Sequence, residues 1–216
     1  MLLLGPPGNG KTHAIKAIIN ESHLPCVYVK SFTGRYTDPA DSIAQVFERA
    51  RSLAPCIVVL EDLDALINDT NRSFLLNELD GFAANHGLVT IASSNHPERL
   101  DPSLLHRPSR FDRKYRFELP DLALRSRYLH QWSRRLPTPA AKHALDRAAT
   151  LTEGFTFAYL KETGLSTQMQ LASEGQTRSA GDVLLSVIEG LKQEIASPPV
   201  ERPAPAAPLV PPCAEF

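Results

Sequence analysis

The residues with the clearest chemical potential form a glycine-rich stretch near the start of the chain. They fit the pattern G-x-x-x-x-G-K-[ST] and are Gly5, Pro6, Pro7, Gly8, Asn9, Gly10, Lys11 and Thr12. Glycines allow backbone angles that side chains forbid, so successive N–H groups can point inward at an anion. Lys11 can reach the β- and γ-phosphates of a nucleotide, and the Thr12 hydroxyl can ligate Mg²⁺. The pattern predicts a phosphate-binding loop, and the alternative is a chance glycine-rich turn.

The segments on either side of this loop favour phosphate binding. Residues 2–4 are leucines that predict the end of an apolar strand, and residues 13–19 have the pattern of an amphipathic helix. This motif requires a strand, a loop and a helix in that order. A helix that starts near Lys11 adds its positive N-terminal dipole to the same place. We therefore expect nucleotide contacts from Gly5 through His13.

Two adjacent acids follow the next apolar run. Residues 57–60 are Ile-Val-Val-Leu, which is typical of a strand buried on both faces of a parallel sheet. Glu61 and Asp62 come directly after it, at the carboxyl end of the strand and beside the loop in an open sheet. One carboxylate can hold Mg²⁺ or its waters, and the other can polarise the water that attacks the γ-phosphate.

An asparagine ends the next predicted strand. Residues 88–92 are apolar, and Ser93, Ser94 and Asn95 follow them. From that position Asn95 can reach the attacking water or the γ-phosphate. The alternative is a residue that serves an Asx-type turn.

A turn-rich loop carries the fourth group of interest. Residues 107–113 hold three arginines in seven positions, among them Arg107 and Arg110. Such a cluster suggests an anion site, because an arginine supplied by a neighbouring molecule stabilises charge on a transferring phosphoryl group. The alternatives are a solvated basic loop or ion pairs with Asp101 and Asp112.

The elements that must position these residues alternate between strands and helices. Strands are predicted at residues 2–4, 26–30, 57–60, 88–92 and 113–117, and helices at 41–50 and 72–85. This alternation predicts an α/β domain over residues 1–120, a three-layer sandwich with a mostly parallel sheet.

The pattern changes after residue 120. Helical periodicity without a strand predicts a small helical domain over 121–196, with helices at 121–136, 139–151, 156–172 and 179–195. Residues 197–216 hold seven prolines in twenty positions and predict a disordered or extended tail.

Composition excludes some classes of protein. The net charge of −1 argues against a general polyanion binder, including a nucleic-acid motor. Cys26, Cys56 and Cys213 lack metal-ligand spacing, and the first two begin apolar runs, so we expect core thiols in a reducing compartment. The sequence has no apolar run of about 18 residues and no signal-peptide pattern, so we expect a cytoplasmic protein without a membrane span.

Five stretches resemble the ATPase domain of the AAA family, within the AAA+ superfamily, in the family's order and spacing. They are GPPGNGKT, VFERARSLAPCIVVLEDLDAL, NRSFLLNELDG, TIASSNHPERLDPSLL and RPSRFDRKYRFELPD. Together they cover about residues 2–121. Residues 152–160, TEGFTFAYL, also resemble the start of the third helix of the family's lid domain.

The resemblance implies a P-loop NTPase fold, a helical lid, and a role for each candidate residue. Glu61 and Asp62 occupy the Walker B pair, and Asn95 occupies the sensor-1 position. Arg107 and Arg110 occupy the arginine-finger positions, which act on a neighbour's nucleotide in a ring that is usually a hexamer. We assign Mg²⁺ to Thr12 and Glu61 and water activation to Asp62, with the two acids exchanged as the alternative.

The sequence departs from the family's pattern at three places. The usual Walker B order is Asp-Glu, whereas here it is Glu61-Asp62. The pore loop usually presents an aromatic, an apolar residue and glycine, whereas residues 34–36 are Gly-Arg-Tyr, which leaves Tyr36 as the candidate. Family members also carry more chain before the P-loop, including groups that hold the adenine. Either such a part is missing here, or the C-terminal part covers the base alone.

Two functions follow from these expectations. The first is Mg²⁺-dependent ATP hydrolysis in a homo-oligomeric ring that unfolds, threads or disassembles a protein partner. The second is a nucleotide-binding module that switches or scaffolds with little turnover. In both, the ligands are ATP and ADP.

Overall fold

The computed structural model describes residues 1–32, 38–80, 85–107, 110–173 and 178–196. The candidate pore-loop residue Tyr36 and the predicted tail over residues 197–216 lie outside the described residues.

The strands confirm the prediction of a parallel α/β sheet. They are β1 (Leu2–Leu4), β2 (Cys26–Val29), β3 (Cys56–Leu60), β4 (Leu88–Ser94) and β5 (Lys114–Arg116). Their order is β2-β3-β4-β1-β5, and every pair among them is parallel. Leu60 lies beside Ala92, and Leu4 lies beside Ser94. The carboxyl ends of β3, β4 and β1 therefore meet at one edge, which is where ligands bind in open sheets.

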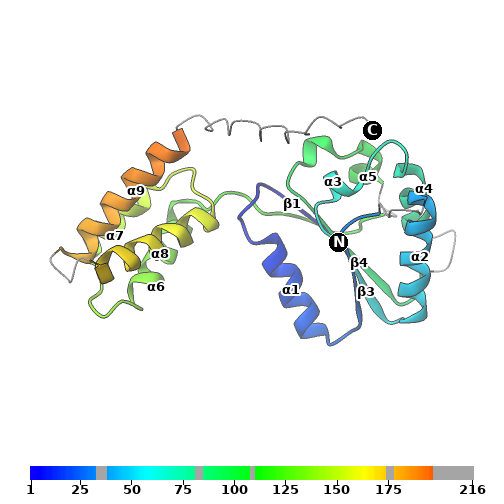
Figure 1. The fold of residues 1–216 in the computed structure, drawn as a ribbon, viewed down its shortest axis with the longest axis horizontal. Coiled ribbons are helices and arrows are strands. Elements are labelled where there is room, and N and C mark those ends of the chain that lie inside the picture. Colours follow the sequence, from blue (N-terminus) through cyan, green and yellow to red (C-terminus); the bar gives the residue numbers. More distant parts are fainter. Residues whose placement is uncertain (33–37, 81–84, 108–109, 174–177, 197–216) are drawn as a thin grey trace, which may run out of the picture.

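Helices cover both faces of this sheet (Figure 1). Helix α1 (Lys11–Ser22) packs Ile15 on one face, against residues such as Val59. Helices α2 (Pro39–Ser52) and α4 (Arg72–Asp80) pack on the other face, against residues such as Val58. Successive residues of a strand point to opposite faces, so the apolar run of β3 is buried throughout.

Three short helices were not predicted from the sequence. They are α3 (Leu63–Leu66), the 3₁₀ helix η1 (Pro97–Arg99) and α5 (Pro102–His106). Each is shorter than two turns, which is too short for a periodic pattern of apolar residues to predict a helix. Their position matters, because α3 follows the predicted acids and η1 follows Asn95.

The helices after the sheet are α6 (Leu122–Ser133), α7 (Lys142–Leu151), α8 (Phe157–Ser173) and α9 (Ala180–Ala196). They form a group of their own at one end of the molecule (Figure 1), with a separate apolar core that includes Leu129, Leu145 and Leu184. Buried Arg125 donates to the carbonyl oxygens of Pro120 and Ala149, at 2.8 and 3.0 Å. The exact domain boundaries at residues 120 and 196 stay a prediction. In the described part of the chain, no helix has the length and apolarity to cross a membrane.

Candidate nucleotide-binding site

The glycine-rich loop connects β1 to α1 in the geometry that the sequence predicts. Gly5, Gly8 and Gly10 have positive φ angles of 142°, 82° and 95°. Helix α1 begins at Lys11, and its N-cap residue, Gly10, has no side chain to cap the helix. The first N–H groups of α1, at its positive end, are therefore suited to receive an anion.

A cavity of about 480 Å³ lies at this loop and brings three separate parts of the sequence together. It is lined by Pro7, Gly8, Gly10, Lys11, Thr12, His13, Lys16, Asp62, Ser93 and Asn95. The predicted loop, one of the two predicted acids and the predicted asparagine thus surround one space. Lys16 and Ser93 were not singled out from the sequence. Lys16 could have been, because it lies four residues after Thr12 and so on the same face of the helix.

Lys11 is a buried cation whose present partners are neutral. Lys11 is 5% exposed, and its Nζ donates to the carbonyl oxygens of Gly5 and Pro6 at 2.6 and 2.9 Å. Burial lowers the pKa of Lys11, and the nearby carboxylates, led by Asp62, oppose that change. Burial disfavours a charge that lacks a charged partner, so a phosphate would be a better acceptor than the loop's own carbonyls.

Asp62 and Asn95 are joined across the ends of β3 and β4. The Asn95 side-chain amide donates to Oδ1 of Asp62 at 2.7 Å. Asp62 has a left-handed backbone, with φ 50°, which aspartate tolerates better than most residues and which often marks a functional position. No hydrogen bond to Oδ2 is seen among the described residues, so this oxygen could accept from a water. The Asn95 side chain therefore bonds to the predicted acid and not to a turn of its own backbone.

Asp64 is a third acid at this edge, which the sequence analysis did not select. Its Oδ1 accepts from the Ser94 hydroxyl at 2.6 Å and from the Asn95 backbone N–H at 3.2 Å. It therefore fixes the segment that carries Asn95. The sequence offered one signal for Asp64, its position two residues after Asp62. That position indicates a role at this edge only when it is known that helix α3 lies against β4.

Glu61 does not line the cavity at the loop. Its Oε2 accepts a hydrogen bond from the Tyr28 hydroxyl of β2, and its Oε1 is buried without a hydrogen-bond partner among the described residues. Glu61, Tyr28 and Asp62 line a second cavity of about 370 Å³ on the β2 side. The two adjacent acids therefore differ in their surroundings, although Asp62 borders both cavities.

The residues here suit Mg²⁺. Carboxylate and hydroxyl oxygens are the ligands that Mg²⁺ takes, usually together with several waters and substrate phosphates. Glu61 has one carboxylate oxygen that no hydrogen bond satisfies within the described residues, and exposed Thr12 lines the cavity at the glycine-rich loop. Both predicted metal ligands therefore have an oxygen to offer.

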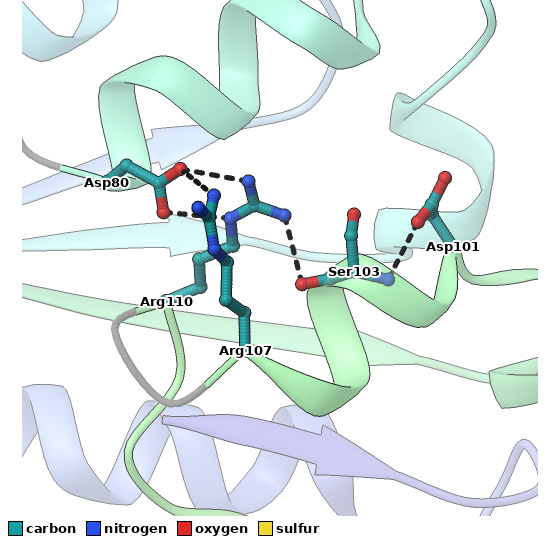
Figure 2. Close-up of polar contacts among 5 residues, drawn as sticks. All are labelled: Asp80, Asp101, Ser103, Arg107 and Arg110. Atoms are coloured by element: carbon teal, nitrogen blue, oxygen red, sulfur yellow. Dashed lines mark hydrogen bonds and ion pairs between the residues drawn. The ribbon is translucent and has the colours of Figure 1, made fainter.

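The two candidate finger arginines converge on Asp80 at the end of α4 (Figure 2). Arg110 is 5% exposed in its side chain and binds both carboxylate oxygens of Asp80, at 2.8 and 2.9 Å, and the Ser103 carbonyl at 2.9 Å. Arg107 is 60% exposed and makes one contact with Asp80, at 2.8 Å. The hydrogen bond from Asp80 raises the pKa of Arg110. Neither arginine lines the cavity at the glycine-rich loop.

This geometry corrects the ion-pair partners named from the sequence. Ion pairs with Asp101 and Asp112 were one alternative to an anion site, and the structure pairs both arginines with Asp80 instead. Asp101 accepts from the Ser103 backbone N–H at 2.7 Å and pairs with Arg72 at 2.8 Å. Proximity in sequence suggested the wrong acid, because tertiary packing of α4 brings Asp80 to the loop from 27 and 30 residues away.

The start of α8 touches the glycine-rich loop directly. The backbone N–H of Ala158 donates to the Gly8 carbonyl at 3.0 Å, and that of Phe157 donates to Oδ1 of Asn9 at 3.3 Å. A Cβ on Gly8 would lie 2.9 Å from both Ala158 and Thr156. Glycine is therefore required there both for its backbone angle and for this close approach. The Asn9 side chain is used within the protein, which leaves contact with a nucleotide to its backbone.

Three relatives found by comparison with known proteins are ATP-dependent zinc metalloproteases. The chain is 36% identical over 178 residues to the ATP-dependent zinc metalloprotease FtsH of Neorickettsia risticii, covering 74% of this chain and 27% of that protein. It is 30% identical over 217 residues to FtsH 2 of Alkaliphilus metalliredigens, with coverages of 90% and 31%. It is 38% identical over 180 residues to the chloroplastic FTSH of Capsicum annuum, with coverages of 74% and 26%. The chain thus spans less than a third of the length of these relatives.

A family match agrees with them. Residues 1–119 match the family described as "ATPase family associated with various cellular activities (AAA)". That segment holds all five strands, the glycine-rich loop, both acids, Asn95 and both arginines. The resemblance seen in the motifs is confirmed, and the chain belongs to the AAA family of ATPases.

Proposed function

We propose that this chain binds ATP with Mg²⁺ at the cavity beside the glycine-rich loop, hydrolyses it, and acts as one subunit of a ring. In that ring the cycle of hydrolysis drives the unfolding, disassembly or other remodelling of a protein partner. The relatives are named ATP-dependent proteases. The zinc-binding motif H-E-x-x-H of metalloproteases does not occur in these 216 residues, so the proposal concerns the ATPase step alone.

One observation carries the hydrolytic part of the proposal, namely the Asp62–Asn95 pair at the same cavity as Lys11 and Thr12. Lys11 and the start of α1 would hold the phosphates. Asp62 would accept a proton from, or orient, the attacking water, and Asn95 would keep the carboxylate in position. A nucleotide switch needs the phosphate cradle alone, whereas hydrolysis also uses a polar side chain that orients or activates the attacking water.

Thr12 and Glu61 would hold Mg²⁺ directly or through its waters. When bound, the metal neutralises charge on the phosphate oxygens. Lys16 would add a further cation to the same cavity.

The arginine cluster supports the proposal of a ring, with different roles for its two members. Arg110 is buried and binds both the Asp80 carboxylate and the Ser103 carbonyl, so it would hold the loop in place. Arg107 is exposed, and within the described ranges its one ion pair is with Asp80, so it can leave Asp80 for a neighbour's triphosphate. We therefore propose Arg107 as the residue that acts on the adjacent subunit.

Replacement of Asp62 tests hydrolysis separately from binding. Asp62→Asn should keep ATP binding, because Lys11 and the loop are unchanged, and should slow phosphate release at least about 100-fold, the lower range for loss of a general base. Phosphate release and the binding of a non-hydrolysable ATP analogue would be measured on the same preparation. Asn95→Ala should give a smaller loss, since it only positions the carboxylate.

Lys11→Ala gives the background of this assay, because this variant should neither bind ATP tightly nor hydrolyse it. Wild-type phosphate release no faster than in Lys11→Ala, together with tight nucleotide binding, would favour the switch or scaffold function. If Glu61→Gln stops turnover with ATP bound and Asp62→Asn changes only Mg²⁺ dependence, the roles of the two acids are exchanged.

A further inference from the structure

Tyr28 has an unusual position for an aromatic residue of a buried sheet. It is 44% exposed and lies on β2, an edge strand of the sheet. Its neighbours Val27 and Val29 pack into the core on the opposite face. The ring therefore contributes little to the core, and the feature that distinguishes it is the hydrogen bond from its hydroxyl to Glu61.

The pairing of β2 with β3 places this hydroxyl. Tyr28 lies beside Val59 in the parallel register, and Glu61 comes two residues after Val59. Residues two apart along an extended chain project from the same face, and diagonal neighbours are within reach of a long side chain. The contact thus follows from strand register and links an edge strand to one of the site's acids.

Glu61 has its two oxygens in unequal states because of this contact. Oε2 accepts from Tyr28, whereas Oε1 is buried and has no partner among the described residues. A buried carboxylate oxygen without a donor is unfavourable, because it has lost its water without gaining a partner. Binding of a cation, or of a water held by a cation, is the event that would satisfy it.

We propose that Tyr28 is a positioning residue for Mg²⁺: its hydroxyl fixes Glu61 through Oε2, so that Oε1 is the oxygen presented to the metal or its water. This rests on the proposed function, which assigns Mg²⁺–ATP to the adjoining cavity. Hydrogen bonds to ligating carboxylates orient them, and loss of such a partner typically lowers metal affinity or activity 10- to 100-fold.

The test is Tyr28→Phe, which removes the hydroxyl alone. Affinity for a non-hydrolysable ATP analogue would be measured by calorimetry with excess Mg²⁺ and again with EDTA. The ratio of the two affinities is the gain due to the metal. We expect Tyr28→Phe to reduce this gain about tenfold, to leave the affinity in EDTA unchanged, and to leave the melting temperature nearly unchanged.

Tyr115→Phe is the matched control. Tyr115 is 47% exposed and lies on β5, the opposite edge strand of the same sheet. Its replacement should leave the gain due to Mg²⁺ at the wild-type value. A double variant completes the design, because in Glu61→Gln the further change Tyr28→Phe should have no additional effect if Tyr28 acts through Glu61.

The outcomes separate this inference from the function on which it rests. An unchanged or larger gain from Mg²⁺ in Tyr28→Phe, when the wild type shows a clear gain, overturns the role of Tyr28 alone. The same loss in Tyr115→Phe, or a loss in EDTA, also overturns it, because the effect would then be structural. A wild type whose affinity does not depend on Mg²⁺ overturns both proposals.

Discussion

Lys11 in the glycine-rich loop and Arg110 in the arginine cluster are both buried cations, but their surroundings are opposite. Among the described residues, the hydrogen-bond partners of Lys11 are neutral carbonyl oxygens, and burial lowers its pKa. Arg110 is bound to both oxygens of Asp80, and that hydrogen-bonded carboxylate raises its pKa. Lys11 would gain from the arrival of an anion. Arg110 is already neutralised, and leaving Asp80 would cost it a bidentate pair.

Arg107 lies between these two cases. It shares Asp80 with Arg110, yet its side chain is 60% exposed, and in the part of the chain that the structure describes its one ion pair is this contact at 2.8 Å. Exposed ion pairs contribute about 0–1 kcal/mol, so Arg107 can exchange its partner with little loss. We therefore propose different roles for the three cations: Lys11 would receive a phosphate, Arg110 would stabilise the loop, and Arg107 would exchange Asp80 for a new partner.

The largest effect should come from Arg107→Ala. We expect turnover in the assembled state to fall about 10³-fold, the scale reported for loss of an arginine finger, with affinity for the ATP analogue unchanged. Phosphate release would be followed against protein concentration, because wild-type activity per chain should rise as rings form.

Mixing variants tests whether Arg107 acts between subunits. Lys11→Ala chains retain Arg107, and Arg107→Ala chains retain Lys11, so some mixed interfaces should be complete. Recovered activity supports action across the interface. Absence of recovery in a mixture shown by mass to co-assemble would refute it.

Arg110→Ala should have its main effect on stability. Removing one partner of a buried ion pair typically costs about 3–5 kcal/mol, and at about 2–4 °C per kcal/mol for a chain of this size the melting temperature should fall by at least about 6 °C. Calorimetric melting would measure this, with Arg107→Ala as the matched control, which should lower the melting temperature by about 4 °C or less. Equal shifts in the two variants would contradict the distinction between them.

The smallest effect concerns pH. Because burial lowers the pKa of Lys11, part of the lysine is neutral at alkaline pH in the free protein and must take up a proton to bind phosphate. Affinity for the ATP analogue should therefore fall, by at most about tenfold per pH unit, at a lower pH than an ordinary lysine pKa of about 10.4 predicts. Titrations between pH 7 and 10 would show it. Lys11→Arg should lack this fall in affinity because arginine stays charged. Identical pH profiles for the wild type and Lys11→Arg would contradict the prediction.

Much of the fold was predictable because local signals carry it. The leucines of residues 2–4 and the apolar run at 57–60 indicate buried strands, and both are observed. The glycine-rich loop was predictable because its function depends on the backbone angles of consecutive residues. The polar residues at the ends of β3 and β4 were predictable as neighbours because parallel strands bring their carboxyl ends to one edge.

Other features required the tertiary structure, because they join residues that no local pattern relates. Asp80 reaches the arginines through the packing of α4, and Tyr28 reaches Glu61 through strand register. The different surroundings of the two adjacent acids are also set by the tertiary structure: Asp62 lines both cavities, whereas Glu61 lines the one on the β2 side and not the one at the glycine-rich loop. The sequence by itself determined the family, the sheet and the residue types of the site. Only the three-dimensional packing decided which acid faces which cavity and which arginine is free to move, since partners and burial depend on long-range contacts.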